Sequence, residues 1–144
     1  MSVDDHKRQF RRLIEDAMNR GKLDLFDELM APDMVEHEAL GPGIPPTREG
    51  VKLFFAGLQQ AFPDMQGTIE DEIAEGDKLV ARVTMRGTHT GSFMGIAPTG
   101  KRVEMEVIDI CRFAEGRLVE HWGLSDALGL LQQLGAVPAP GGGS

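Results

Sequence analysis

The spacing of apolar residues changes once along this chain, and that change restricts the fold more than any other feature. Up to about residue 62, apolar side chains recur every three or four residues, which is typical of amphipathic helices. From about residue 67 to residue 122 they alternate with polar side chains, which is typical of half-buried strands. The predicted helical stripes are Phe10 to Met18, Leu23 to Met30 and Val51 to Phe62. Helices followed by strands predict an α+β domain with the helices packed on one face of a sheet.

Two turn signals predict that the strands pair as antiparallel hairpins. Gly76-Asp77 and Glu115-Gly116 each stand between two alternating segments. The segments that they join are 67–75 with 78–89, and 103–113 with 118–122. Long antiparallel strands twist, so the sheet should curve. We therefore expect a cone-shaped, curved antiparallel sheet with the N-terminal helices over its concave face and a cavity between them.

The remaining elements are short. A strand is expected at 34–39, and Thr47 should cap the third helix. Residues 126–134 should form a closing helix that ends at Gly135. The sequence predicts one domain over residues 1–135, followed by a flexible tail or linker over 136–144 that is rich in Pro and Gly.

Composition excludes several classes of function. The net charge of −8 argues against binding to nucleic acid or to an anionic membrane surface, because both need clustered Lys and Arg. No run of 18 apolar residues and no signal peptide is recognisable. A single cysteine excludes an internal disulfide and fits a cytoplasmic protein.

Asp109 is the first candidate for a functional residue. Alternation places it on the same face as five apolar residues of its strand, which are Val103, Met105, Val107, Cys111 and Phe113. Burial disfavours the charged form of a carboxyl group. Asp109 is therefore either a general base whose pKa is raised by an apolar pocket, or a structural residue with a hydrogen-bond partner.

His121 and Trp122 are neighbours, so only one of them can face the cavity. A two-residue turn at Glu115-Gly116 would place Asp109 opposite Trp122, whose indole could donate to the carboxylate. A bulged three-residue turn would place it opposite His121 and create an Asp–His dyad. The sequence leaves both registers open.

Other polar residues have a functional and a structural interpretation. His37 shares a face with Val35 and Ala39, and it could polarise a carbonyl group or only line the pocket. Asp126 could contribute to the pocket, but it is explained as well by capping of the last helix. His89 is expected at the surface, and Cys111 in the core.

The expected site is a pocket for a hydrophobic small molecule, without a metal. The catalytic candidates are Asp109, His37 and His121, and the predicted pocket residues are Trp122, Phe54, Phe62, Met85, Met105 and Asp126. The four histidines lack the spacing of a metal site, and no phosphate-binding loop or serine-nucleophile motif is present.

Several short segments resemble the SnoaL-like polyketide cyclases, or ester cyclases, of the nuclear transport factor two-like superfamily. In chain order they are Ala31-Pro32-Asp33, Phe62-Pro63-Asp64, Ala74-Glu75-Gly76-Asp77, Gly87-Thr88-His89-Thr90-Gly91, Met94-Gly95-Ile96-Ala97-Pro98-Thr99-Gly100-Lys101 and Val119-Glu120-His121-Trp122. The resemblance runs from about Phe10 to Leu134. It implies a cone-shaped α+β barrel, a homodimer formed through the sheet, and closure of a ring in a polyketide methyl ester by an intramolecular aldol reaction without metal or cofactor. In several catalytic relatives an active Asp looks to follow the Trp of the last segment, whereas this chain has Gly123 there.

Three functions remain in competition. The first is a cofactor-free cyclase, isomerase or lyase that acts on a hydrophobic carbonyl compound, with Asp109 as base and His37 or His121 at the oxygen. The second is a non-catalytic protein that binds a hydrophobic small molecule. The third is an epoxide hydrolase, which Gly123 disfavours because that reaction needs two acids.

Overall fold

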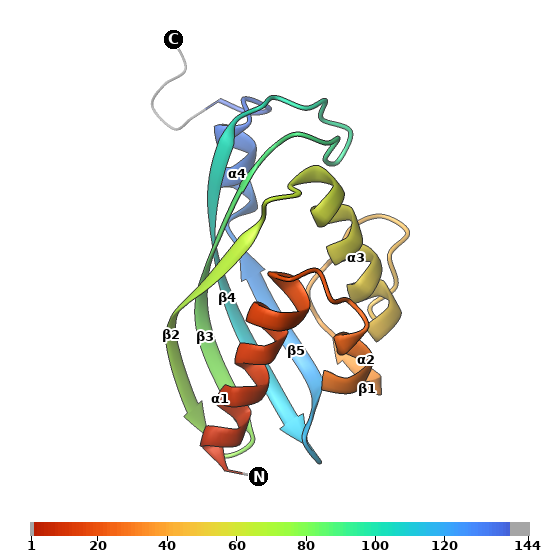
Figure 1. Cartoon of the computed structure of the whole chain (residues 1–144), viewed down its shortest axis with the longest axis vertical. Helices are drawn as coiled ribbons and strands as arrows, with labels where there is room; N and C mark the ends of the chain where they lie inside the picture. The colour runs from red at the N-terminus through yellow and green to blue at the C-terminus, as the bar shows by residue number, and fades with distance from the viewer. Residues whose placement is uncertain (1, 139–144) are drawn as a thin grey trace.

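A single curved sheet with helices on its concave face forms the protein (Figure 1). The computed structural model describes residues 2–138. Its elements are α1 (Val3–Arg11), the π-helix η1 (Arg12–Met18), α2 (Leu25–Leu29), β1 (Met30–Glu36), α3 (Arg48–Ala61), β2 (Gln66–Glu75), β3 (Lys78–Thr88), β4 (Arg102–Ala114), β5 (Arg117–Ser125) and α4 (Ala127–Gln133). The strand order is β1-β5-β4-β3-β2. The α+β prediction is confirmed, and the sheet is open rather than a closed barrel.

The first helix crosses the concave face and supplies much of the core. Ser2 and Asp5 form a capping box at its N-terminus, and the helix continues from α1 into η1. Its apolar stripe is buried, and it comprises Phe10, Leu13, Ile14, Ala17 and Met18. The side chain of Asn19 then bonds both the amide nitrogen (2.7 Å) and the carbonyl oxygen (2.9 Å) of Gly67 on β2. The helix is therefore fixed to the sheet at its C-terminal end.

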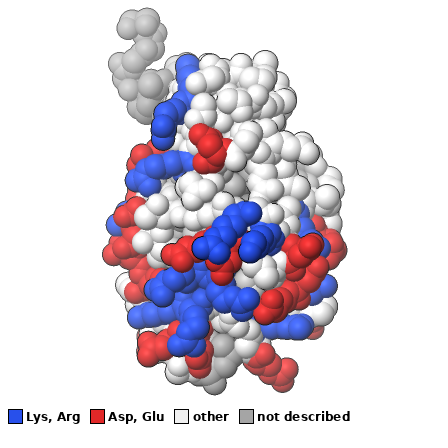
Figure 2. All heavy atoms as spheres, viewed as in Figure 1, with Lys and Arg blue, Asp and Glu red and all other residues white. Residues whose placement is uncertain are grey.

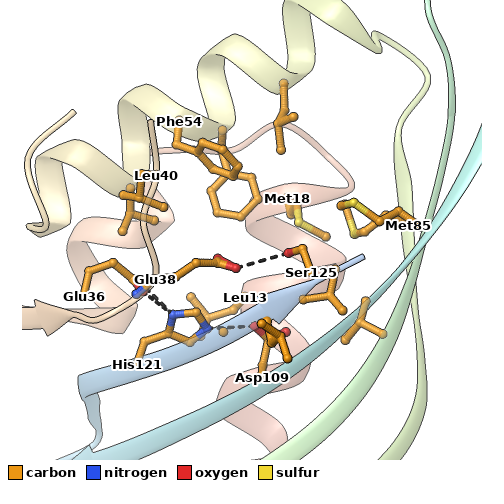
Figure 3. A pocket seen from close by; sticks show the side chains of 18 of the residues that line it. Leu13, Met18, Glu36, Glu38, Leu40, Phe54, Met85, Asp109, His121 and Ser125 are labelled. Atoms are coloured by element: carbon orange, nitrogen blue, oxygen red, sulfur yellow. Dashed lines mark hydrogen bonds and ion pairs between the residues drawn. The ribbon is translucent and has the colours of Figure 1, made fainter. Parts of the chain in front are cut away.

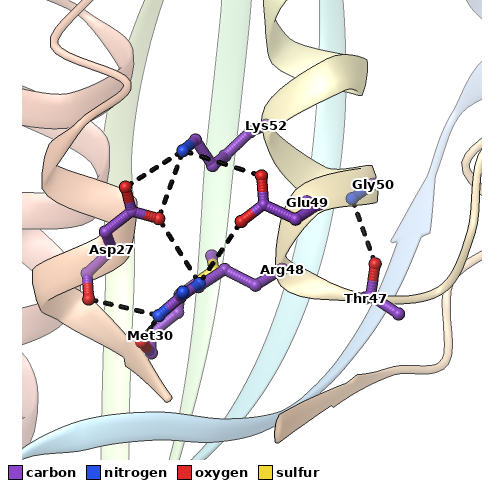
Figure 4. Close-up of polar contacts among 7 residues, drawn as sticks. All are labelled: Asp27, Met30, Thr47, Arg48, Glu49, Gly50 and Lys52. Atoms are coloured by element: carbon purple, nitrogen blue, oxygen red, sulfur yellow. Dashed lines mark hydrogen bonds and ion pairs between the residues drawn. The ribbon is translucent and has the colours of Figure 1, made fainter. Parts of the chain in front are cut away.

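A cluster of charged side chains joins α2 to α3 (Figure 4). Lys52 Nζ lies 3.0 and 3.2 Å from the two carboxylate oxygens of Asp27. Arg48 donates to the carbonyl oxygens of Asp27 (3.4 Å) and Met30 (3.3 Å). As predicted, Thr47 caps α3 by accepting from the amide of Gly50. These contacts fix the position of α3, which forms one wall of the cavity described below.

The two predicted hairpins are both present, and each contains one irregularity; the one in the second hairpin sets the register around Asp109. Glu115 and Gly116 form a two-residue turn with φ values of 51° and 81°. Phe113 pairs with Leu118, but Arg112 pairs with Glu120, so Val119 is an extra residue in β5. The bulge reverses the phase of side-chain alternation along the rest of β5. Both registers proposed from the sequence are therefore wrong, because Asp109 lies directly opposite Gly123.

The first strand differs from its prediction in both bounds and phase. It was expected at 34–39 and instead covers Met30–Glu36, where it pairs with β5 in parallel. Met34 and Glu36 are buried, whereas Val35 is 46% exposed. The side chain of Val35 thus faces outward, and the carboxylate of Glu36 faces the interior.

The C-terminal helix closes one end of the sheet. Asp126 caps α4 by accepting from the amide of Gly129 (3.0 Å), and Gly135 follows the helix with φ 79°. Most of the predicted tail, residues 139–144, lies outside the described residues. Within residues 2–138, no helix combines the length and the hydrophobicity needed to cross a membrane.

Charged side chains gather at one end of the visible face (Figure 2). They cover its lower half, around α1 and α2, while the upper part near α3 and the loop after β3 is largely free of them. Three segments contain no Lys, Arg, Asp or Glu, namely 39–47, 53–63 and 89–100. The part of this face that these segments form is therefore nearly uncharged.

Candidate active site

A cavity of about 460 Å³ lies between the concave face of the sheet and the helices. Most of its lining side chains are apolar, and they come from all the helices, from β1, β3, β4 and β5, and from the loops after β1 and β3. Five polar side chains also line it, which are Glu36, Glu38, Asp109, His121 and Ser125 (Figure 3). The volume falls within the range of about 300–1,000 Å³ that is usual for small-molecule sites.

His121 is held between two carboxylates. Its Nδ1 lies 2.6 and 2.9 Å from the two carboxylate oxygens of Glu36, and its Nε2 lies 2.7 Å from Oδ1 of Asp109 (Figure 3). The side chains of Glu36, Asp109 and His121 are 3%, 13% and 15% exposed. Burial by itself lowers the pKa of His121, but the hydrogen bonds and charges of Asp109 and Glu36 outweigh it and raise the pKa from 6.5 to about 10. His121 is therefore an imidazolium at neutral pH.

Strand pairing explains how the three residues meet. Glu36 is the register partner of His121 in the parallel pair of β1 and β5. On the other side, His121 pairs with Cys111, two residues from Asp109 on the same face of β4. Diagonal neighbours of this kind lie within reach of a long side chain. The Asp–His pair thus exists, but it is diagonal rather than directly opposite.

The protonation of His121 should make stability depend on pH. The folded-state pKa is above the unfolded value, so the stabilisation is complete below pH 6.5 and is lost as the pH rises toward 10. We expect the free energy of unfolding to fall by about 1.4 kcal/mol per pH unit between pH 7 and 8.5. Urea denaturation across this range measures the slope.

The matched control for this titration replaces the whole group, Glu36→Gln with Asp109→Asn and His121→Gln, which removes both carboxylates and the imidazolium and should show no such slope. The range ends at pH 8.5 because burial raises the pKa of the Cys111 thiol well above its ordinary 9.0. Cys111 would therefore add its own loss of stability at higher pH. A slope that is equal in both proteins would contradict a protonated His121.

Glu38 is the third acidic side chain of the cavity, and it lies beside Gly123. Its Oε1 accepts a hydrogen bond from the hydroxyl of Ser125 at 3.1 Å. Burial raises the pKa of Glu38, an effect that the charge of His121 and the bond from Ser125 partly oppose. A Cβ atom on Gly123 would lie 2.9 Å from Oε1 of Glu38 and 2.9 Å from Cε1 of His121. The missing side chain at position 123 thus leaves space for the Glu38 carboxyl group.

The structure brings together about half of the residues predicted for the site. Asp109, His121, Phe54, Met85 and Met105 all line the cavity. Their placement agrees with the pattern of apolar residues along α3, β3 and β4. Whether Asp109 and His121 act in catalysis stays a prediction.

His37 and Trp122 lie elsewhere, and their assignment to the pocket is wrong. The two rings stack on each other with centroids 4.9 Å apart, and neither residue lines the cavity. His37 Nε2 is 2.7 Å from Glu120, and Lys78 Nζ lies 5.5 Å from the Trp122 ring. The bulge at Val119 and the phase of β1 place both rings on the outer face of the sheet.

Phe62 and Asp126 do not line the main cavity either. Phe62 is buried in the core, where its ring contacts His89 and Phe93. Asp126 is the cap of α4, which is its structural interpretation. His89 was expected at the surface but is completely buried, with Nδ1 3.0 Å from the hydroxyl of Thr99. Cys111 is a core residue, as expected.

Glu36 and Glu38 are the residues that sequence reasoning missed. In the sequence they occupy alternate positions with Met34 and Leu40, so the signal was the series Met34, Glu36, Glu38 and Leu40 at every second residue. The sequence analysis instead considered the other face of this segment, the one of Val35, His37 and Ala39. Within residues 2–138 no group of three or more His, Cys, Asp or Glu side chains is arranged to hold a metal ion.

Comparisons with known proteins identify relatives across nearly the whole length. The family model described as SnoaL-like polyketide cyclase matches residues 8–134. Aklanonic acid methyl ester cyclase DnrD of Streptomyces peucetius is 32% identical, over 92% of this chain and 92% of the relative. Nogalonic acid methyl ester cyclase of Streptomyces nogalater is 28% identical, over 83% and 90%. The crystal structure of IdmH from Streptomyces antibioticus superposes with a TM-score of 0.78 and 40% identity, over 90% of this chain and 97% of that one.

Proposed function

Because the chain belongs to the SnoaL-like polyketide cyclase family, we propose that it closes a ring in a polyketide by an intramolecular aldol reaction in this cavity. The observation that carries the proposal is the placement of Asp109. Its carboxylate stands in the cavity wall, and His121 holds it through Oδ1 only. Among the described residues, none donates a hydrogen bond to Oδ2 of Asp109.

Asp109 acts as the base in this mechanism. It removes a proton from the carbon next to a carbonyl group, and the resulting enolate attacks a second carbonyl of the same molecule. With His121 protonated, the group of Glu36, His121 and Asp109 carries a net charge of −1, from two carboxylates and one imidazolium. The cluster can therefore accept one proton and become neutral. His121 positions the carboxylate, since both of its ring nitrogens are already bonded.

The substrate is a hydrophobic compound with more than one carbonyl group. The lining of the cavity favours an apolar guest, since its side chains from α1, η1 and α3 are all uncharged. The two relatives named above act on aklanonic and nogalonic acid methyl esters. We propose a polyketide ester of this kind as substrate, with catalysis by side chains alone.

Incubation with aklanonic or nogalonic acid methyl ester tests this function. An intramolecular aldol addition moves atoms within one molecule, so the product must be an isomer of equal mass with a different retention time in liquid chromatography. We expect the purified protein to convert at least one of the two esters. An ester that stays intact while remaining bound in native mass spectrometry would instead identify a binding protein. Failure to bind or convert either ester would overturn the proposal.

A further inference from the structure

We propose that Glu38 is the general acid of this site, and that the absence of a side chain at Gly123 is what admits its carboxyl group to the cavity. The inference rests on the proposed function, since it assigns the second proton transfer of the same ring closure. An aldol addition needs an acid as well as a base, because the oxygen of the attacked carbonyl gains a proton as the carbon–carbon bond forms. No histidine of the cavity is free for this role, as His121 is bonded at both nitrogens.

The geometry around Glu38 favours the role of proton donor. Its backbone amide donates to Oε1 of Glu36 at 2.9 Å, so Glu38 is bonded directly to the group of Glu36, His121 and Asp109. Ser125, at the end of β5, donates to Oε1 of Glu38. When Glu38 is protonated at Oε2, that hydroxyl has no acceptor among the described residues and can donate to a substrate. The carboxyl group of Glu38 points into the cavity between β5 and α3 (Figure 3).

The surroundings keep a proton on Glu38 at a higher pH than usual. Burial raises its pKa, and the negative charges of Asp109 on β4 and Glu36 on β1 add to this, while His121 on β5 and the hydroxyl of Ser125 oppose it. The helices contribute only apolar side chains to the cavity, from Phe10, Leu13, Ile14 and Met18 on one side to Phe54, Phe55 and Leu58 on the other. Two carboxyl groups in one site with different surroundings can divide the roles of acid and base.

The protons of the reaction balance across the two residues. The substrate loses one proton from carbon to Asp109, and the new carbon–carbon bond takes the electron pair of that C–H bond. The π electrons of the attacked carbonyl move to its oxygen, which takes the proton of Glu38. Afterwards Asp109 is protonated and Glu38 is charged. Proton exchange with water restores both groups for the next cycle.

Glu38→Gln separates this role from the others when two rates are measured in deuterated water. The first rate is exchange of the substrate's acidic C–H for deuterium, which needs only the base. The second is ring closure, which needs the acid. We expect Glu38→Gln to slow closure by roughly 10²–10⁴-fold while exchange stays within about threefold of the wild type. Asp109→Asn should slow both rates, and Glu75→Gln, an exposed residue at the end of β2, should change neither.

The pH profile gives a second readout that a purely structural role would not move. Wild-type closure should fall at high pH, where Glu38 loses its proton, while exchange should not fall with it. The residual closure of Glu38→Gln should lack this decrease.

The possible outcomes distinguish this inference from the proposed function. Full closure activity in a folded Glu38→Gln protein would overturn the role of Glu38 and leave the cyclase assignment standing. Equal losses of exchange and closure in that variant would also overturn it, because Glu38 would then support the site as a whole. A wild-type protein that performs neither reaction on either ester would overturn the proposed function, and the role of Glu38 with it.

Discussion

Replacing Asp109 with Asn should lower the rate of ring closure by roughly 10²–10⁴-fold, the usual contribution of a general base. The amide oxygen of Asn can still accept the hydrogen bond from His121 Nε2, so the geometry of the pair should survive. What the amide cannot do is take a proton from carbon. Steady-state assay of the variant with aklanonic acid methyl ester, beside circular dichroism to confirm the fold, measures the effect.

The matched control for Asp109→Asn is Asp126→Asn, since Asp126 caps α4 and does not line the cavity. Asn is also a good capping residue, so this variant should keep both its stability and its activity. Unchanged turnover in a well-folded Asp109→Asn protein would eliminate Asp109 as the base. Catalysis would then have to be assigned to another group of the cavity.

Replacing His121 with Gln should lower the free energy of unfolding by about 3–5 kcal/mol at pH 7, the usual result of removing one partner from a buried ion pair. Glu36 and Asp109 would remain inside the protein without the cation between them. Both side chains are less than one-seventh exposed, so water cannot replace the lost partner easily. Urea denaturation followed by circular dichroism gives the free energy.

His37→Gln is the control for this measurement. His37 also pairs with a carboxylate, that of Glu120, but its side chain is 40% exposed on the outer face of the sheet. An exposed pair contributes about 0–1 kcal/mol, so the two histidine variants should differ severalfold in their effect. Equal, small effects for both would mean that the ion pairs of His121 with Glu36 and Asp109 do not stabilise the fold.

Helices and hairpins could be predicted from the sequence because local patterns determine them. The stripe from Phe10 to Met18 and the two-residue turn at Glu115-Gly116 each depend on residues close together in the chain. The same holds for the capping of α3 by Thr47. Local patterns of this kind determine the folded structure unless tertiary contacts oppose them.

The site was harder to predict because it depends on the phase of two strands. A single extra residue, Val119, changes which of His121 and Trp122 faces inward, and nothing in the composition of β5 marks the bulge. In β1 the apolar Val35 faces outward, while Glu36 is buried because His121 compensates its charge. That compensation comes from a residue 85 positions away, so no local pattern could reveal it.

The nearly uncharged part of the face in Figure 2 has a consequence for which guest the cavity binds. Leu40, Phe54 and Met94 line the cavity and come from the three segments without Lys, Arg, Asp or Glu. Long-range attraction needs such charges, and these segments supply none. Recognition on this side therefore depends on shape and on the release of water from apolar surfaces, which favours a neutral guest over an ionised one.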